Sequence, residues 1–194
     1  GAFAVVPGPG VLNTTAALST SWAANVPVLC VTGQIPSASI GRGYGQLHEI
    51  PDQLSILQGL TKSAARIDHP TDAPAKVAEA FRQLRTGRPR PVALEMPLDQ
   101  LAEACSVDLL DAATDHARPP VDEDALAKAA KLLAGAKAPM IFVGSGAVDS
   151  GEAVQALAEM LQAPVIANRT GRGIVSHRHY LSMMHLEGHR LWAD

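Results

Sequence analysis

The feature that most constrains the fold is a sharp junction between a strand and a helix near the start of the chain. Residues 3–6 (FAVV) form an apolar run typical of a buried strand, and residues 7–10 (PGPG) end it. An apolar, alanine-rich pattern of helical spacing follows over residues 11–24. In α/β proteins ligands bind where a strand ends and a helix begins. The junction therefore predicts an α/β fold with a candidate ligand-binding turn, and a plain structural turn is the alternative.

Apolar runs and helical patterns alternate along the rest of the chain. Strands are predicted over residues 26–33, 62–67, 92–96, 139–143 and 163–167, and helices over residues 52–58, 72–85, 122–136 and 150–161. This alternation indicates parallel sheets with flanking helices and right-handed crossovers. Asp72 and Asp122 are expected to cap their helices. The helix faces expected to be buried are Val77, Ala80, Phe81 and Leu84, and Leu126, Ala129, Ala130 and Leu133.

Composition excludes several classes of function. The net charge of the 194-residue chain is −3, without basic blocks, and aromatic residues make up only 4% of it, so nucleic acid is not expected as a partner. No apolar run reaches the length that spans a membrane, so no membrane partner is expected either. The two cysteines, Cys30 and Cys105, lie far apart and do not require an oxidising compartment. We expect a cytoplasmic protein.

Six segments, in order and at appropriate spacing, resemble the thiamine-diphosphate-dependent enzymes of the acetohydroxyacid (acetolactate) synthase and benzoylformate decarboxylase group. They are VVPGPGVLN (5–13), VPVLCVTGQIP (26–36), IGRGYGQLHE (40–49), LTK (60–62), TGRPRPVALEMPLD (86–99) and AAKLLAGAKAPMIFVGSGA (129–147). The resemblance covers nearly the whole chain. Several ordered matches are more specific than any single glycine-rich turn.

The resemblance implies a division into parts of two domains. Residues 1–104 would be the C-terminal part of the pyrimidine-binding thiamine-diphosphate domain, residues 105–118 a linker, and residues 119–194 the N-terminal part of a Rossmann-like central domain. The family's catalytic glutamate would precede Gly1. Its Mg²⁺-binding Gly-Asp-Gly…Asn signature belongs to a third domain that the sequence does not contain. We therefore expect a fragment that is inactive by itself and does not bind the cofactor tightly.

The resemblance also assigns a cofactor-binding turn and a neighbouring loop. Residues matching the turn at the aminopyrimidine end of thiamine diphosphate are Gly8, Pro9, Gly10 and Asn13. The long loop over residues 37–51 carries Gln46, assigned to cofactor binding, and His48 and Glu49, assigned to catalysis near the reacting carbon. A histidine can move a proton near neutral pH, as decarboxylation and carboligation require. The alternatives are a structural turn and an ordinary loop histidine.

A flavin site is possible but disfavoured. The residues that match flavin contacts of the acetohydroxyacid synthases are Arg88, Gly144 and Gly146. Ser145 interrupts the Gly-Gly-Gly of those enzymes, and residues 182–185 (SMMH) lack the glycines of the matching segment. These departures favour a protein without functional FAD. The alternative for Arg88 is an arginine at a helix end that interacts with the last carbonyls.

The chain is therefore interpreted as a fragment of a 2-keto-acid carboligase or decarboxylase. The resemblance implies thiamine diphosphate and Mg²⁺ as cofactors, a small 2-keto acid as substrate, and a homodimer or homotetramer. A non-catalytic nucleotide-binding or regulatory α/β protein that retains the scaffold is the alternative. No metal site is predicted within the chain, because its C-terminal histidines (His177, His179, His185 and His189) lack accompanying carboxylate or cysteine ligands.

Overall fold

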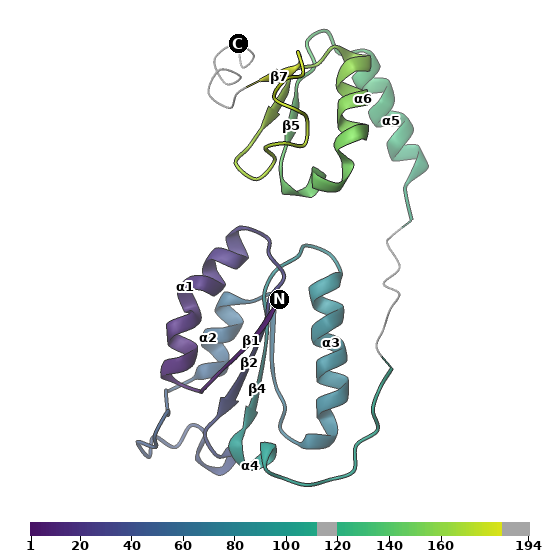
Figure 1. Cartoon of the computed structure of the whole chain (residues 1–194). Helices are drawn as coiled ribbons and strands as arrows, with labels where there is room; N and C mark the ends of the chain where they lie inside the picture. The colour runs from purple at the N-terminus through teal and green to yellow at the C-terminus, as the bar shows by residue number, and fades with distance from the viewer. Residues whose placement is uncertain (112–119, 184–194) are drawn as a thin grey trace. The chain divides into compact units, whose positions relative to one another are not determined.

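The structure, a computed structural model, describes residues 1–111 and 120–183. The chain forms two compact units, unit 1 (Gly1–Arg118) and unit 2 (Pro119–Asp194), shown in Figure 1. Each unit contains a parallel sheet with flanking helices, so the predicted fold class is confirmed. The two units are described separately below.

Unit 1 is built on a four-stranded parallel sheet with the strand order β1-β2-β4-β3. Because all four strands run in the same direction, their carboxyl ends meet at one edge of the sheet. The elements in chain order are β1 (Ala2–Val5), α1 (Pro9–Ala23), β2 (Leu29–Gln34), η1 (Ser37–Ser39), α2 (Gln53–Leu60), β3 (Ser63–Arg66), η2 (Pro70–Asp72), α3 (Ala73–Arg85), β4 (Val92–Pro97) and α4 (Leu98–Leu101).

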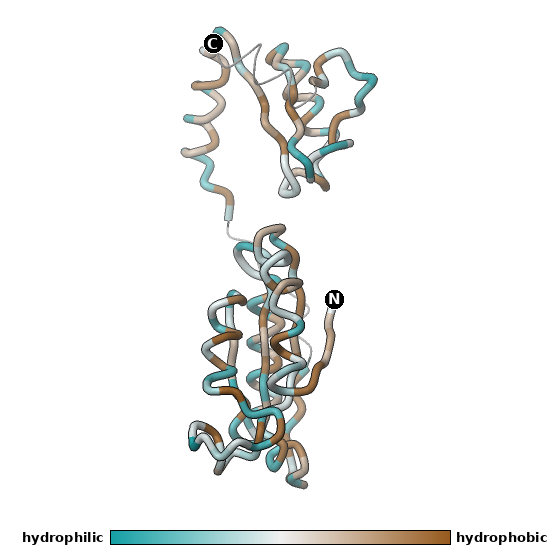
Figure 2. Tube along the Cα trace, turned by 90° about the vertical axis from the view of Figure 1, so that its left-hand side faces the viewer, coloured by the Kyte–Doolittle hydropathy of each residue, from teal (hydrophilic) through white to brown (hydrophobic). Residues whose placement is uncertain are grey.

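Helices cover both faces of this sheet, with α1 and α2 on one face and α3 on the other (Figure 1). One apolar cluster contains Val11, Leu18, Cys30, Leu57 and Ala93, and the other contains Leu29, Ile67, Ala80, Val92 and Leu94. Figure 2 shows the hydrophobic residues running along the central strands. Cys30 is fully buried in the first of these clusters, and this burial raises the pKa of its thiol to about 11.

The predicted buried face of α3 is only partly correct. Ala80 is buried and Leu84 packs against the core, as predicted. Val77 and Phe81 are instead 38% and 42% exposed. Helical spacing places all four residues on one stripe, but the sheet contacts only part of that stripe. Asp72 occupies the residue before α3, yet its side chain makes no capping hydrogen bond.

Unit 2 contains a three-stranded parallel sheet with the order β5-β6-β7. Its elements are α5 (Glu123–Ala134), β5 (Ile141–Val143), η3 (Ser145–Ser150), α6 (Gly151–Leu161), β6 (Val165–Ala167) and β7 (Ser182–Met183). Its core contains Val143, Ala158, Val165, Val175 and Leu181. The two-residue strand β7 was not predicted, because so short a segment carries no alternating pattern.

The prediction for α5 is correct in its start and wrong in its burial. Asp122 caps the helix, since its carboxylate Oδ1 accepts a hydrogen bond from the Ala125 N–H at 2.9 Å. No residue of α5 is buried. The four residues predicted to face inward are all exposed, namely Leu126, Ala129, Ala130 and Leu133. Amphipathic spacing indicates an apolar stripe but does not specify what covers it.

No helix in the described part of the chain is both long enough and apolar enough to cross a lipid bilayer.

Candidate functional site

The predicted ligand turn lies at the carboxyl end of β1, where Gly8 precedes α1. Gly8 has a φ of 60°, a backbone conformation that residues other than glycine rarely adopt. A Cβ atom at this position would lie 2.3 Å from the carbonyl oxygen of His48. The glycine is therefore required both by its own backbone and by the close approach of the loop that carries His48. The structure thus brings together two predicted site residues that are 40 positions apart.

The other residues of the predicted turn lie on the first turns of α1. Pro9 and Asn13 are exposed, and Gly10 is half-buried. Gly10 also packs tightly, since a Cβ there would lie 2.7 Å from Cγ2 of Val6. Asn13 therefore presents its amide at the surface beside the turn, where a ligand can reach it.

The loop between η1 and α2 is held by its own side chains. The Glu49 carboxylate accepts hydrogen bonds from the backbone N–H groups of Gly43 and Gln46, at 3.0 and 2.9 Å. The Gln46 amide donates to Oγ of Ser39 at 2.8 Å. Glu49 thus organises the loop, and its predicted catalytic role stays a prediction.

His48 is half-buried, and it has an unusual backbone conformation for its residue type, with a φ of 72°. A left-handed conformation at a residue other than glycine costs roughly 1 kcal/mol or more and is found preferentially at functional sites. It places the His48 carbonyl against Gly8. This geometry agrees with a functional loop.

A buried polar cluster that the sequence analysis missed lies at the same edge of the sheet. Glu95, on β4, is fully buried, and its Oε1 pairs with Nε of Arg66 at 2.6 Å. Its Oε2 accepts a hydrogen bond from the Gln53 amide at 2.8 Å and a longer one from the Gln34 amide at 3.4 Å. Three donors thereby compensate the carboxylate for its lost hydration. The sequence did contain one signal for this cluster. Glu95 interrupts an otherwise apolar strand run, and a buried glutamate needs a polar partner.

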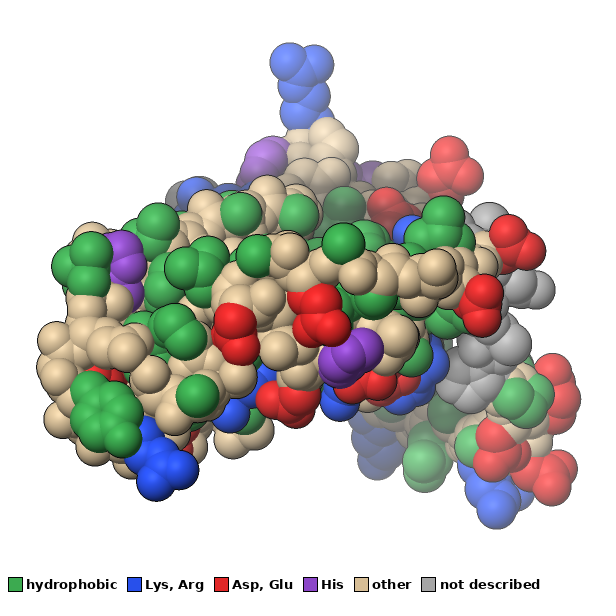
Figure 3. All heavy atoms as spheres, turned by 90° about the horizontal axis from the view of Figure 1, so that it is seen from below, with side chains coloured by type: hydrophobic (Ala, Val, Ile, Leu, Met, Phe, Trp, Pro, Cys, Tyr) green, Lys and Arg blue, Asp and Glu red, His purple; other side chains and the backbone are tan. Residues whose placement is uncertain are grey.

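A cavity of about 320 Å³ opens beside this cluster. Its lining includes Gln34, Gln53 and Arg66 together with Asp52 and Ser55 at the start of α2. Asp52 caps α2 by accepting from the N–H and hydroxyl of Ser55, and these hydrogen bonds hold the pKa of its carboxyl below the usual range. Figure 3 looks onto this end of unit 1, where charged and histidine side chains are scattered among uncharged ones.

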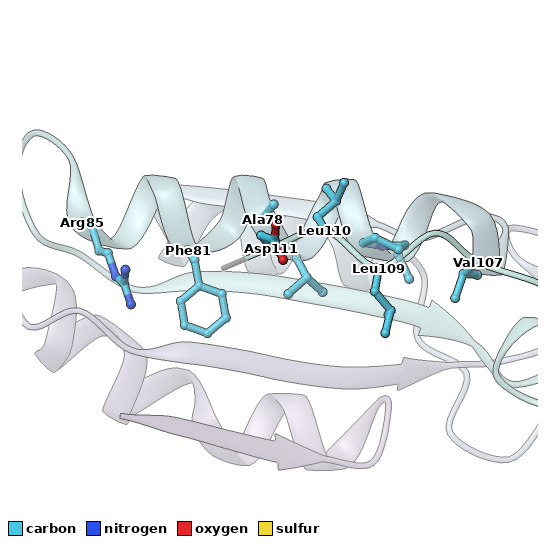
Figure 4. Close-up of a pocket in the computed structure, with 10 residues that line it drawn as sticks. Ala78, Phe81, Arg85, Val107, Leu109, Leu110 and Asp111 are labelled. Atoms are coloured by element: carbon cyan, nitrogen blue, oxygen red, sulfur yellow. The ribbon is translucent and has the colours of Figure 1, made fainter. Parts of the chain in front are cut away.

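Another cavity of unit 1, larger than the one beside Glu95, lies elsewhere and is apolar. It has a volume of about 480 Å³ and lies between α3 and residues 107–111. Figure 4 shows its lining side chains along α3, with Arg85 and Phe81 toward one end and Leu109 and Val107 toward the other. None of the predicted site residues lines it. We therefore place the candidate site at the carboxyl edge of the sheet, where polar side chains and the glycine turn converge.

The residues predicted to contact flavin lie in different units. Arg88 is exposed and follows α3 in unit 1, whereas Gly144 and Gly146 belong to unit 2. A Cβ at Gly144 would lie 2.9 Å from Nδ2 of Asn168, and a Cβ at Gly146 would meet no atom within 4 Å. Gly144 is therefore required for packing within unit 2, and the flavin roles of all three residues stay predictions.

The described residues contain no cluster suited to a metal ion. Across residues 1–111 and 120–183, no three His, Cys, Asp or Glu side chains are grouped as metal ligands. Nε2 of His179 lies 2.9 Å from Oε1 of Glu159, so this histidine has an ordinary surface partner. His185 and His189 lie outside the described residues.

Comparisons with known proteins match two domains of one family. The N-terminal thiamine-pyrophosphate-binding domain of thiamine pyrophosphate enzymes matches residues 1–56, and the central domain of these enzymes matches residues 126–192. Together the two matches cover more than half of the chain.

Individual relatives have names that fit these domains. A probable 2-ketoarginine decarboxylase of Pseudomonas aeruginosa is 38% identical over 88% of this chain and 31% of its own length. The large subunit of acetolactate synthase isozyme 1 of Escherichia coli is 30% identical over 91% of this chain and 31% of its own length. A glyoxylate carboligase of Escherichia coli is 30% identical over 90% of this chain and 29% of its own length. The chain thus spans about 30% of the length of these relatives.

Proposed function

Since this chain belongs to the thiamine-diphosphate-dependent enzyme family, we propose that it forms part of a 2-keto-acid carboligase or decarboxylase of the acetolactate-synthase-like kind. The observation that carries the proposal is the turn at the carboxyl end of β1. There Gly8 is closed against the backbone of His48, and Asn13 lies exposed on the helix that follows. This is the position at which α/β sheets bind ligands.

We propose that the described residues bind one end of thiamine diphosphate. We propose that the aminopyrimidine contacts Pro9, Gly10, Asn13 and Gln46 around the turn, with Gly8 providing its backbone shape. Asn13 supplies an exposed amide with both donor and acceptor atoms. The bound cofactor would supply the nucleophilic carbon and the electron sink that 2-keto-acid chemistry requires. No cluster of metal ligands lies among the described residues, and the family resemblance implies that Mg²⁺ is bound by a third domain of such enzymes.

In this proposal His48 takes part in proton transfer, and Glu49 holds the loop that positions the His48 side chain. Glu49 holds the loop through the N–H groups of Gly43 and Gln46. The half-buried His48 is carried by that loop beside the turn at Gly8, and histidine is the residue type that most often serves as a general acid or base. His48 orients or protonates the reacting group, and the loop keeps it in place.

Replacing His48 by alanine in the full-length protein is expected to lower kcat by about 10²-fold, the scale of a lost general acid or base. The cofactor affinity should change much less, because the backbone of residue 48 rather than its side chain faces Gly8. Steady-state kinetics and a titration with thiamine diphosphate measure the two effects. Leu47→Ala, at the exposed neighbouring position, is the matched control. An unchanged kcat would remove His48 from the mechanism.

The remaining parts of the proposal rest on the family resemblance. Residues 1–104 form part of the pyrimidine-binding domain, residues 105–118 a linker, and residues 119–194 part of the central domain. The whole protein acts on small 2-keto acids as a cytoplasmic homodimer or homotetramer. FAD is not included, since Ser145 interrupts the expected glycine run.

Product identification tests the proposed activity. The full-length protein is incubated with thiamine diphosphate, Mg²⁺ and a 2-keto acid, and the products are identified by mass spectrometry. Pyruvate is the first substrate, and 2-ketoarginine is the second because one relative carries that name. Both reactions release CO₂ from pyruvate, so the organic product distinguishes them: we expect acetolactate if the enzyme is a carboligase and a free aldehyde if it is a decarboxylase. Failure to bind the cofactor would favour a non-catalytic protein that keeps the scaffold.

A further inference from the structure

Beneath the turn at Gly8, the side chain of Gln53 connects three segments of unit 1. Gln53 begins α2, and its side chain is almost completely buried, with 1% exposed. Its Oε1 accepts a hydrogen bond from the Gly8 N–H at 2.8 Å. Its Nε2 donates to the Gly33 carbonyl at 3.0 Å and to Glu95 at 2.8 Å. One amide therefore joins the turn after β1 to β2 and β4.

The surroundings fix the orientation of this amide. In the reverse orientation its oxygen would face the Gly33 carbonyl and the Glu95 carboxylate, which are both acceptors. Its NH₂ group would then face the Gly8 N–H, which is a donor. Only the observed orientation satisfies all three partners, so Glu95 and Gly33 determine that an acceptor points at Gly8.

Gly8 is consequently held from two directions. Gln53 fixes its N–H, and the His48 carbonyl closes against its Cα. The peptide N–H of Gly8 is buried by this contact and is not offered to a ligand. Thus the turn depends on Gln53 for its position, while the residues after it, Pro9 and Asn13, face outward.

We propose that Gln53 is a positioning residue for thiamine diphosphate, because it sets the Gly8 turn through a hydrogen bond whose direction Glu95 and Gly33 impose. The inference rests on the proposed function and extends it to a residue that does not touch the cofactor. Replacing Gln53 should therefore weaken cofactor binding by shifting the Gly8 turn, even when the protein remains folded.

The test uses the full-length protein with Gln53→Met, which keeps the length of the side chain and removes its hydrogen bonds. Gln58→Met is the matched control, because Gln58 is an exposed glutamine on the same helix. Hydrogen exchange of the turn is measured without cofactor, and the thiamine diphosphate Kd is measured by titration calorimetry. Circular dichroism establishes that each variant is folded under the conditions of the titration.

For Gln53→Met we expect faster exchange over residues 5–13 and a Kd raised about tenfold, or about 1.4 kcal/mol, the scale of one lost hydrogen bond. Gln58→Met should change neither quantity. If Gln53→Met does not fold, the double variant Gln53→Met/Glu95→Met removes the buried carboxylate with its donor and should show the same Kd shift.

The outcomes separate this inference from the proposed function. If the wild-type protein binds the cofactor and Gln53→Met exchanges faster without any change in Kd, the inference is overturned and the proposed function stands. If Gln53→Met leaves exchange of the turn unchanged, the inference is also overturned. If the wild-type protein does not bind thiamine diphosphate, the proposed function fails and the inference fails with it.

Discussion

Replacing Arg66 by alanine is expected to lower the free energy of unfolding of unit 1 by about 3 kcal/mol, because the change leaves a buried carboxylate without its cation. Glu95 is fully buried, and Arg66 is its charged partner at 2.6 Å. The amides of Gln53 and Gln34 still donate to Glu95 in the variant. Because these two hydrogen bonds remain, the expected loss of unfolding free energy lies at the lower end of the range found when a buried ion pair is broken.

Urea denaturation followed by tryptophan fluorescence measures this loss. Trp22 lies in unit 1, with the Arg90 guanidinium 3.7 Å above the centre of its ring, so its emission reports on unfolding of this unit. The chain has one other tryptophan, Trp192, which is replaced by phenylalanine in all variants so that the signal comes from Trp22 alone.

The matched control is Arg82→Ala. Arg82 contacts Glu79 at the same 2.6 Å distance, but about half of each side chain is exposed. The contact lowers the pKa of the Glu79 carboxyl to about 2. Water and salt screen an exposed pair, so we expect almost no change in the unfolding midpoint. Equal effects of the two substitutions would contradict the assignment of Arg66 and Glu95 as a buried pair.

Replacing Gly8 by alanine is expected to have the largest effect on the candidate site. The new Cβ would lie 2.3 Å from the His48 carbonyl oxygen, so one of the two backbone segments must move. The positive φ adds about 1–2 kcal/mol of backbone strain. We expect a total loss of roughly 4 kcal/mol, the size that only severe strain or packing defects reach. Binding of thiamine diphosphate by the full-length protein should be lost.

Gly45→Ala is the control for the backbone contribution alone. Gly45 also has a positive φ, of 71°, but a Cβ there would meet no atom within 4 Å. Only the strain of about 1–2 kcal/mol is then expected. The same Trp22 measurement compares the two variants, and cofactor titration shows whether binding follows. If Gly8→Ala were no more destabilising than Gly45→Ala, the contact between the turn and the His48 loop would be refuted.

The order of helices and strands could be predicted from sequence because it depends on local patterns. Apolar runs bounded by proline and glycine marked the strands, as at residues 3–6 and 92–96. The Asp122 cap was equally local, since the side chain and the N–H that it accepts from are three residues apart. The family resemblance also rested on ordered short motifs, and the family matches confirm it.

Burial of helix faces was predicted less well. Helical spacing identified the stripes of α3 and α5, yet Phe81 is partly exposed and no residue of α5 is buried. The spacing of apolar residues is a property of the helix alone, whereas burial depends on a second surface. The strand order and the elements that flank each sheet determine which surface covers a helix face.

The sequence by itself determined the α/β class, the position of the glycine turn and the family. Only the tertiary structure decided that Gln53, Arg66 and Glu95 meet beneath that turn. These residues are 13 to 42 positions apart in the sequence. They come together because β4 lies between β2 and β3 in a parallel sheet, which gathers the ends of distant strands at one edge. A buried charge must find its partners there, and no local pattern encodes that requirement.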